Sequence, residues 1–364
     1  MINADELSSL GRIVSSRRAR VGDNNIPPDD LPSIAITSRQ ASDESAADLL
    51  RNATIWLVVF TIILAVAMMA LLGVSGDALS FEGAAQFVAA ALLSSAVLRQ
   101  RGRMSRLALC LGAQGLVALS GIAGGIICLM GLQLGFPTVD RALKAADQAL
   151  GVGGLPVVEW VSRAPPGLQQ LIGASYTSTL GLLLLSLFIR SLAGDAKEVW
   201  RATFCFSSSL LLTSLISIVT PAKGLGLWIP DDVLSRFSGE PARYFFPTFD
   251  RFYRGHETVV HLGSIDAVVS FPSFHIVMGL IAVALWRKNI WGLMVGGALF
   301  VVMAIGTIPF GGHYTIDLIG GLLVWAATFG ISSALIRWRV TQKPHACRAD
   351  GRASTDSRRL MSDG

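Results

Sequence analysis

Charged residues are scarce in this chain, and cysteines and histidines are fewer still. Charged residues make up 15% of its 364 residues and hydrophobic residues 52%, whereas average soluble domains carry about 25% charged residues. The net charge of +5 does not indicate nucleic-acid binding, because the basic residues cluster at the ends of apolar runs. The four cysteines lack the paired spacing of a zinc site and do not indicate a disulfide framework, so we interpret them as packing residues: Cys110, Cys128, Cys205 and Cys347.

The first 52 residues contain no apolar core of the kind that a secretory signal peptide needs near its start. They are polar instead, with Asp, Ser and Pro throughout. We expect residues 1–52 to be a disordered cytoplasmic extension and residues 338–364 to be a disordered cytoplasmic tail.

Apolar runs dominate the remaining sequence, and most have the length of about 18–25 residues that a helix needs to cross the hydrocarbon core of a bilayer. The sequence therefore predicts an all-α fold, a polytopic membrane helical bundle with about eight transmembrane helices. The candidate spans are residues 53–74, 81–98, 107–134, 170–190, 202–220, 269–286, 290–309 and 314–336.

Basic residues predict the orientation of these spans. The links between spans two and three, four and five, and six and seven contain Arg and Lys, and the last span ends at Arg337 and Arg339. Eight crossings put all of these residues on one side, which the positive-inside tendency makes cytoplasmic. Both termini are then cytoplasmic, and the long links 135–169 and 221–268 lie outside. We expect a multi-pass integral protein of a bacterial inner membrane.

The two outer links differ in character. The first has apolar residues at helical spacing between Pro137 and Gly151, which predicts a short amphipathic helix along the interface. We interpret Asp140 and Asp147 as its solvated face rather than as a catalytic pair. The second link interleaves arginines with aromatic residues, a pattern that suits a lipid headgroup region.

Two histidines open membrane spans at the outer face: His275 begins span six and His313 begins span eight. Helix N-termini carry unpaired N–H groups and partial positive charge, so they suit a phosphate. Asp317 follows His313 at i+4, where its carboxylate can fix the imidazole tautomer and make the ring nucleophilic. His275 can then act as general acid. Ser273 offers a hydroxyl or N–H donor, and Gly312 lets its backbone N–H approach a phosphate closely.

Two motifs resemble those of the type 2 phosphatidic acid phosphatase superfamily. The run Phe271-Pro272-Ser273-Phe274-His275 is similar to its second motif, and His313-Tyr314-Thr315-Ile316-Asp317 to the end of its third. These variants are most similar to the branch that contains fungal inositolphosphorylceramide synthases and related bacterial proteins. The resemblance covers residues 107–337 as a six-span core, with residues 53–98 as an additional helix pair. It implies a metal-independent enzyme with a phosphohistidine intermediate, in which His313 is the nucleophile, Asp317 its orienter and His275 the acid.

The chain departs from the superfamily pattern at two places. The first motif, Lys-x6-Arg-Pro, is absent, and Gly306-Thr307 replaces the Ser-Arg that normally precedes the histidine of the third motif. Another group must therefore neutralise the charge of the transition state. We predict phosphate contacts from Arg254 and Lys223 of the second outer link, with Arg243 and Arg251 as weaker candidates.

The predicted function is a lipid phosphatase or an inositolphosphotransferase-like enzyme with an extracytoplasmic active site. It needs no metal or other cofactor, acts on a lipid phosphate or phospholipid, and passes the phosphoryl group to water or a small alcohol. The sequence leaves the lipid, the acceptor and the oligomeric state open. Three alternatives fit the sequence less well: a non-enzymatic transporter or lipid-binding protein, a haem protein with paired histidines, and an intramembrane serine protease built on Ser175 of Gly173-Ala174-Ser175.

Overall fold

A computed structural model describes residues 31–102, 104–238, 241–265 and 270–359, with the backbone alone for residues 31–40 and 340–359. The chain divides into two units, Met1–Glu44 and Ser45–Gly364, and the candidate site lies in the second. Residues 1–30 of the expected N-terminal extension, residues 360–364 of the expected tail and the Cys347 side chain lie outside the described residues. The other three cysteines are buried and free, as packing residues should be.

The described secondary structure is almost entirely helical, which confirms the predicted all-α class. Six helices of the described residues are long and apolar enough to cross a membrane, the first over Ala41–Leu72 and the last over Thr315–Arg339. These six are α2 (Leu31–Leu72), α3 (Ala78–Gln100), α4 (Ser105–Gln133), α9 (Ala196–Val219), α13 (Ile290–Thr307) and α14 (Thr315–Arg359).

Two predicted spans have a different form from the one expected. The fourth consists of α7 (Pro166–Thr177) and α8 (Thr179–Leu192), which meet at an angle of 58°. Three consecutive hydroxyl side chains at this junction, Thr177 to Thr179, donate to carbonyls of the preceding turn, and such back-bonding bends helices. The sixth is only the 12-residue helix α12 (Phe274–Leu285), about 18 Å long against about 30 Å of hydrocarbon.

The outermost helices extend beyond the predicted spans. Residues 1–52 and 338–364 were expected to be disordered. Helix α2, however, begins at Leu31 within the first of these segments, and α14 continues to Arg359 within the second. In the second unit the reason is visible, because Ala47 and Leu50 of α2 are buried in an apolar cluster. The helix therefore gains packing before its most apolar run begins.

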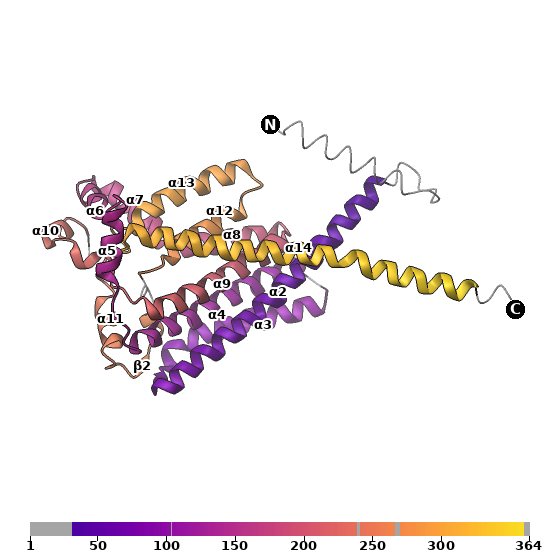
Figure 1. Ribbon diagram of the computed structural model, residues 1–364, viewed down its shortest axis with the longest axis horizontal. Helices are drawn as coiled ribbons and strands as arrows, with labels where there is room; N and C mark the ends of the chain where they lie inside the picture. Colours follow the sequence, from indigo (N-terminus) through magenta and orange to yellow (C-terminus); the bar gives the residue numbers. More distant parts are fainter. Residues whose placement is uncertain (1–30, 103, 239–240, 266–269, 360–364) are drawn as a thin grey trace. The chain divides into compact units, whose positions relative to one another are not determined.

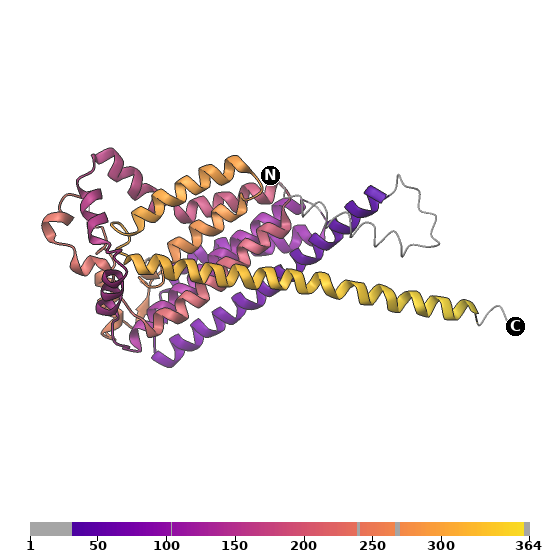
Figure 2. The same ribbon diagram turned by 45° about the horizontal axis from the view of Figure 1, so that its top comes forward.

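Glycines on α4 allow the neighbouring helices to approach it closely. Helix α4 packs against α3 and α9, and α12 packs against α8, α9, α13 and α14. A Cβ atom on Gly124 of α4 would lie 2.6 Å from Leu210 of α9, so only glycine permits this approach. Hydroxyl pairs add polar contacts between helices, such as Ser120 Oγ to Ser207 Oγ at 2.8 Å. In Figures 1 and 2 these long helices run roughly alongside one another.

Short elements gather at one end of the bundle, where Figures 1 and 2 show α5, α6, α10, α11 and β2 around the first turn of α14. The helix predicted in the first outer link is present as α5, and its position along the membrane interface stays a prediction. Strands β1 and β2 form a two-residue parallel pair. The elements here are β1 (Ser75–Gly76), α5 (Asp140–Ala149), α6 (Leu155–Ser162), η2 (Leu225–Trp228), α10 (Asp231–Leu234), α11 (Phe246–Tyr253), β2 (Val259–Val260) and η3 (Leu262–Ile265).

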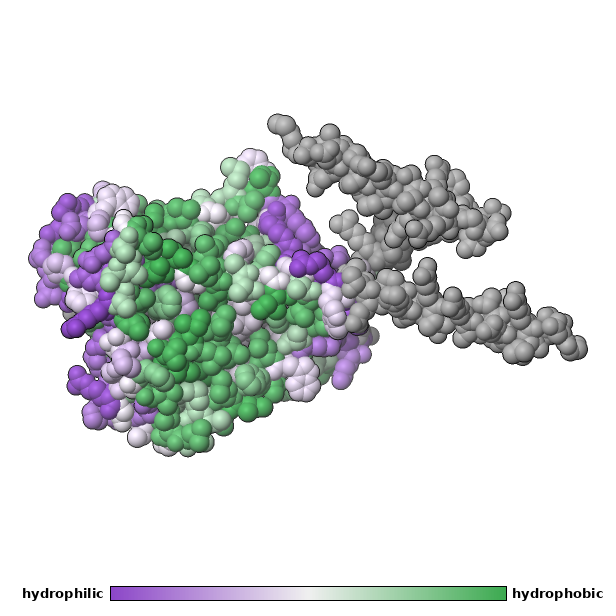
Figure 3. Space-filling model, in the orientation of Figure 1, coloured by the Kyte–Doolittle hydropathy of each residue, from purple (hydrophilic) through white to green (hydrophobic). Residues whose placement is uncertain are grey.

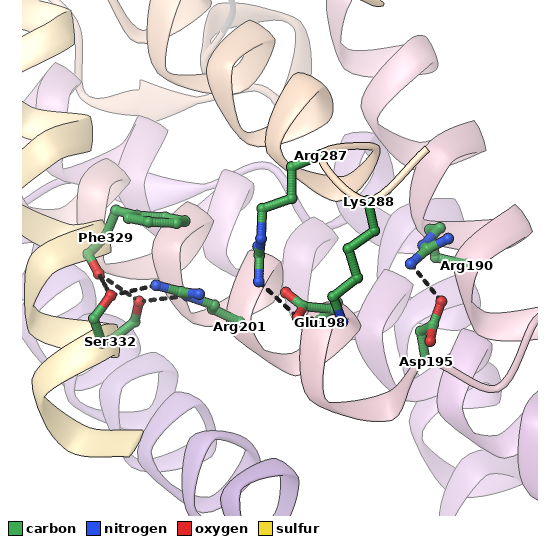
Figure 4. Close-up of polar contacts among 9 residues, drawn as sticks. Arg190, Asp195, Glu198, Arg201, Arg287, Lys288, Phe329 and Ser332 are labelled. Atoms are coloured by element: carbon green, nitrogen blue, oxygen red, sulfur yellow. Dashed lines mark hydrogen bonds and ion pairs between the residues drawn. The ribbon is translucent and has the colours of Figure 1, made fainter. Parts of the chain in front are cut away.

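The other end of the bundle also carries ion pairs, and Figure 4 shows some of them. The buried Glu198 of α9 pairs with Arg287 at 2.7 Å and Lys288 at 3.2 Å, just after α12. Arg201 donates to Ser332 of α14 at 3.0 Å, about 25 Å along the helix from Thr315. Figure 3 shows a largely hydrophobic face between hydrophilic residues at the two ends, as expected for a protein that crosses a membrane.

Candidate active site

His313 and Asp317 contact each other where α14 begins. His313 lies in the turn before the helix rather than in its first turn, and Asp317 is the third helical residue. The Nδ1 atom of His313 lies 3.3 Å from Asp317 Oδ2, and both side chains are buried. This long hydrogen bond is directed at one ring nitrogen and leaves Nε2 for other chemistry.

The Asp317 carboxylate is fixed by further donors. Its Oδ2 atom accepts the Ser270 hydroxyl at 2.7 Å and the Tyr314 N–H at 2.9 Å, while Oδ1 has no hydrogen-bond partner among the described residues. The Ser273 N–H donates to the Asp317 carbonyl at 3.0 Å, which ties the start of α12 to the start of α14. Ser270 was not predicted, because a single serine ahead of the motif carries no pattern of its own.

His275 is the second residue of α12 and faces His313. The two ring centroids are 6.3 Å apart at an interplanar angle of 67°. On its other side, His275 stacks on Tyr176 of α7 with ring centroids 4.1 Å apart. Two contacts of about 3–3.5 Å on opposite sides of one phosphorus span a similar distance. The two histidines are therefore close enough to act on one phosphoryl group.

A cavity of about 670 Å³ extends from His275 into the bundle. Apart from a few hydroxyl groups and the histidine, its lining is apolar, which is typical of sites that hold a small molecule with few directed polar contacts. The lining residues are Gly121, Gly125, Cys128, Tyr176, Thr177, Leu180, Phe206, Leu210, Thr213, Ser238, Pro241, Tyr244, Ile265, Phe274, His275, Met278 and Phe310.

The turn before His313 is closely packed. Gly312 adopts φ +68°, and a Cβ atom there would lie 2.9 Å from the Ala242 carbonyl oxygen. The N–H groups of Gly311 and Gly312 donate to carbonyls one turn earlier, at 3.1 Å each. In this structure Gly312 shapes the turn, and its N–H is already hydrogen-bonded. Its predicted contact with phosphate stays a prediction.

Gly224 supports this turn from the second outer link. Its φ is +87°, and a side chain there would overlap the Gly312 carbonyl and lie 2.8 Å from Ser270 Oγ. The next residue, Leu225, donates its N–H to the Gly312 carbonyl at 2.6 Å. The link after α9, which contains Gly224, thus packs closely against the link before α14, which contains Gly312, at the candidate site.

The interpretation of Asp140 and Asp147 as a solvated face was wrong. Asp140 is 4% exposed, and its carboxylate accepts the N–H groups of Gly224 at 2.7 Å and Lys223 at 3.2 Å and the Tyr314 hydroxyl at 3.2 Å. Burial raises the pKa of the Asp140 carboxyl, and the two N–H donors oppose part of that rise. Burial likewise raises the pKa of Tyr314.

Asp147 lies about two turns further along α5 and is 2% exposed. Its two oxygens accept the N–H groups of Thr315 at 2.9 Å and Ile316 at 2.7 Å, the first two residues of α14. The side chain thus caps the helix that begins directly after His313. Helical periodicity alone cannot show this, because the partners are backbone groups about 170 residues away in the sequence.

The predicted basic residues lie around the site without touching its histidines. Lys223 Nζ pairs with Asp250 at 2.5 Å. Arg243 and Arg251 pair with carboxylates of the same outer link, at 2.7 and 3.5 Å. Arg254, just after α11, is exposed. Within the described ranges, none of these four cations is hydrogen-bonded to either histidine.

Ser273 and Ser175 differ in their environments. The Ser273 side chain is fully buried, and its hydroxyl has no partner among the described residues. The Ser175 hydroxyl donates to the Ile172 carbonyl of its own helix at 2.7 Å, and no described histidine is hydrogen-bonded to it. The described residues therefore contain no Ser–His dyad at Ser175, which the serine-protease alternative requires. In the described part of the chain, no group of three or more His, Cys, Asp or Glu residues is arranged to hold a metal ion.

A comparison with protein families matches residues 141–331, more than half of the chain, to a family described as the PAP2 superfamily. The match includes α7, α12, the first part of α14 and all of α5 except its first residue, Asp140. It therefore covers both histidines, Asp317 and Asp147. Comparisons with curated proteins and with solved structures found no match.

Proposed function

The chain belongs to the PAP2 superfamily, and from that membership we propose that it is a membrane enzyme that cleaves or transfers a phosphoryl group of a lipid through a phosphohistidine. The observation that carries the proposal is the pairing of His313 with Asp317 and the approach of the His275 ring to 6.3 Å. His275 comes from the first turn of α12 and His313 from the turn before α14, so the arrangement does not follow from one local motif.

The reaction proceeds in two steps. Nε2 of His313 attacks phosphorus while Asp317 holds Nδ1, and His275 gives a proton to the leaving oxygen as its bond to phosphorus breaks. An acceptor hydroxyl then attacks the phosphohistidine and loses its proton to His275, which restores both rings. Asp317 is suited to orient His313, since Ser270 and the Tyr314 N–H fix its carboxylate.

The apolar lining of the 670 Å³ cavity supports a lipid substrate. Its position beside His275 suits a molecule with a phosphate at one end and a hydrocarbon chain at the other. Phosphatidate, polyprenyl phosphate or diphosphate, and inositol-containing phospholipids all share this design. Water as acceptor gives a phosphatase, and inositol or another small alcohol gives a phosphotransferase.

Ser273 is the best-supported phosphate ligand, because its buried hydroxyl has no described partner. Lys223 is the next, since it precedes Gly224, which packs against the turn before His313. Its ammonium group then has to leave Asp250 when the phosphate binds. Arg254 is exposed and has to reach the phosphate from outside the cavity. Gly312 contributes through the shape of its turn and, in the phosphate complex, through its N–H.

We further propose that the histidines face the extracytoplasmic side of the membrane. The basic residues Arg201, Arg287 and Lys288 lie at the opposite end of the bundle from α5 and α11. The positive-inside tendency makes that basic end cytoplasmic. Both termini are then cytoplasmic, as the eight predicted spans require.

The deciding experiment incubates the purified protein in detergent with phosphatidate, a polyprenyl phosphate and phosphatidylinositol, each labelled at phosphorus, with and without added inositol. We expect release or transfer of label from at least one lipid, and an acid-labile labelled protein after rapid quenching. His313→Ala should abolish both signals, and His275→Ala should slow turnover by about 10²–10⁴-fold.

Ser175→Ala is the matched control, because it changes a buried residue of α7 that the reaction does not use. Its activity should equal that of the wild type. Full turnover by His313→Ala contradicts the nucleophile, and inactivity of the wild type toward every lipid contradicts the proposed function as a whole. A dependence of product formation on inositol identifies a transferase.

A further inference from the structure

Tyr176 lies against His275 and near His313, although it belongs to neither motif. Its ring stacks on His275 with centroids 4.1 Å apart and planes at 27°, and the side chain is 4% exposed. Its hydroxyl and the Cδ2 atom of His313 each lie 2.8 Å from the point where a Cβ atom on Gly311 would stand. The phenol thus lies along one histidine and ends beside the other.

The packing of α7 against α13 brings Tyr176 to this place. A Cβ atom on Gly306 of α13 would lie 2.7 Å from the Ile172 carbonyl oxygen and 3.3 Å from Tyr176 Cβ. Gly306 therefore allows the two helices to approach closely. Helix α7 ends at Thr177, just after Tyr176, and then bends into α8. The ring therefore lies in the last turn before the chain changes direction.

The two histidines differ in how they are held. His313 has the Asp317 carboxylate at one ring nitrogen. The ring nitrogens of His275 form no hydrogen bond or ion pair with any residue that the structure describes, and its ring contacts are the stack with Tyr176 and the edge of His313. An imidazole without a hydrogen-bonded orienter can rotate about its χ2 angle, and a ring stacked on its face limits that rotation.

We propose that Tyr176 is the positioning residue of the general acid: its ring holds the His275 imidazole in the orientation that delivers a proton to the leaving oxygen. This inference rests on the proposed function, because it assigns a partner to the acid of that reaction. The aromatic ring carries the effect, so phenylalanine should replace tyrosine without much loss.

The chemistry of the leaving group supplies a specific readout. As the His313–phosphorus bond forms and the phosphorus–oxygen bond breaks, the proton of His275 goes to the departing oxygen. An alkoxide needs this proton, whereas the phenolate that leaves an activated aryl phosphate does not. A misplaced acid therefore slows the first step with an alkyl phosphate and spares the first step with an aryl phosphate. General instability of the protein lowers both rates equally.

The experiment measures kcat/KM of purified full-length variants with a short-chain phosphatidate and with p-nitrophenyl phosphate, because kcat/KM excludes the second step, in which His275 acts on both substrates alike. For Tyr176→Leu we expect kcat/KM toward phosphatidate to fall by about 10- to 100-fold, with kcat/KM toward p-nitrophenyl phosphate changed by less than about threefold. Tyr176→Phe should keep both rates within about threefold of the wild type. Gly306→Ala, which pushes α7 away, should reproduce the leucine pattern in milder form.

Phe329→Leu is the control, because Phe329 also stacks on an aromatic ring, that of Trp325, yet lies three turns of α14 beyond Asp317. Its ratio of alkyl to aryl turnover should equal that of the wild type. An unchanged ratio in Tyr176→Leu overturns the inference, as does an equal loss toward both substrates. If Tyr176→Leu does not fold, a large loss of the ratio in Tyr176→Phe also overturns it, because the ring is still present. Inactivity of the wild type toward both substrates contradicts the proposed function instead.

Discussion

Removing the carboxylate of Asp147 tests the contact between α5 and α14 that supports the candidate site. In Asp147→Ala, the N–H groups of Thr315 and Ile316 lose acceptors at 2.9 and 2.7 Å. Both groups belong to a helix N-terminus, where no carbonyl of the same helix can replace the lost acceptor. The N-terminus also loses a negative charge that interacts favourably with the helix dipole.

The expected cost follows from these contacts. A lost N-cap side chain costs about 0.5–2 kcal/mol, and each hydrogen bond to a charged group contributes about 1.5–3 kcal/mol. The alanine variant no longer has to bury a carboxylate, which offsets part of the loss. We therefore expect Asp147→Ala to lower the free energy of unfolding by about 2–4 kcal/mol. Asp147→Asn keeps an acceptor oxygen and should lose about half as much.

Thermal unfolding in detergent, compared with lipid phosphatase activity below the transition, measures both consequences. The unfolding temperature should fall in the order wild type, Asp147→Asn, Asp147→Ala, and activity should fall with it, because His313 and Asp317 flank the capped turn. Asp232→Ala is the control: this α10 carboxylate is 72% exposed, so its removal should cost less than about 0.5 kcal/mol. If Asp147→Ala unfolds at the same temperature as Asp232→Ala, the cap does not exist.

Three further outcomes are expected. Gly224→Ala should reduce both stability and turnover, because its Cβ would overlap the Gly312 carbonyl and crowd Ser270; thermal unfolding and phosphate release measure the two effects. The hydrogen bond from His261 lowers the pKa of Asp77 below its usual 3.8, so this carboxylate stabilises the fold at neutral pH and that contribution is lost as the pH falls through the lowered pKa. The difference in unfolding temperature between wild type and Asp77→Asn should therefore close below pH 3.8. Vanadate should inhibit lipid turnover, and a chelator should leave it unchanged, because the proposed nucleophile and acid are both imidazoles.

The helices were predictable where apolar length alone decides them. The run that became α4 is apolar throughout, and its length leaves no alternative to a buried or membrane-spanning helix. Periodicity between Pro137 and Gly151 likewise identified α5. Length could not reveal that α12 has only 12 residues, because the apolar stretch that contains it includes Phe271 and Pro272, which precede the helix. The bend between α7 and α8 could not be predicted either, because the three hydroxyl residues at the junction lower the hydropathy of the apolar run only slightly.

The candidate site was predictable where its partners are close in sequence. The spacing of His313 and Asp317 is enough to put them in contact, and the Pro-Ser-Phe-His run identified His275. The contacts of Asp140 and Asp147 join α5 to groups more than 80 residues away. A carboxylate at a helical surface position normally faces solvent, and only the packed structure shows that backbone N–H groups replace the water here.

Gly306 shows why a departure from a motif is hard to interpret from the sequence alone. In the sequence it stands where the superfamily pattern has a serine, next to a missing arginine, and the change indicates a lost phosphate clamp. In the structure the same glycine lies against the Ile172 carbonyl, and the space left by its missing side chain lets α7 deliver Tyr176 to His275. The glycine thus also allows Tyr176 to lie against His275, the proposed acid. The sequence change can therefore mean a lost phosphate clamp or a closer contact between α7 and α13. The ratio of alkyl to aryl phosphate turnover in Gly306→Ala tests the helix contact directly, whereas a variant that restores the missing serine and arginine tests only the clamp.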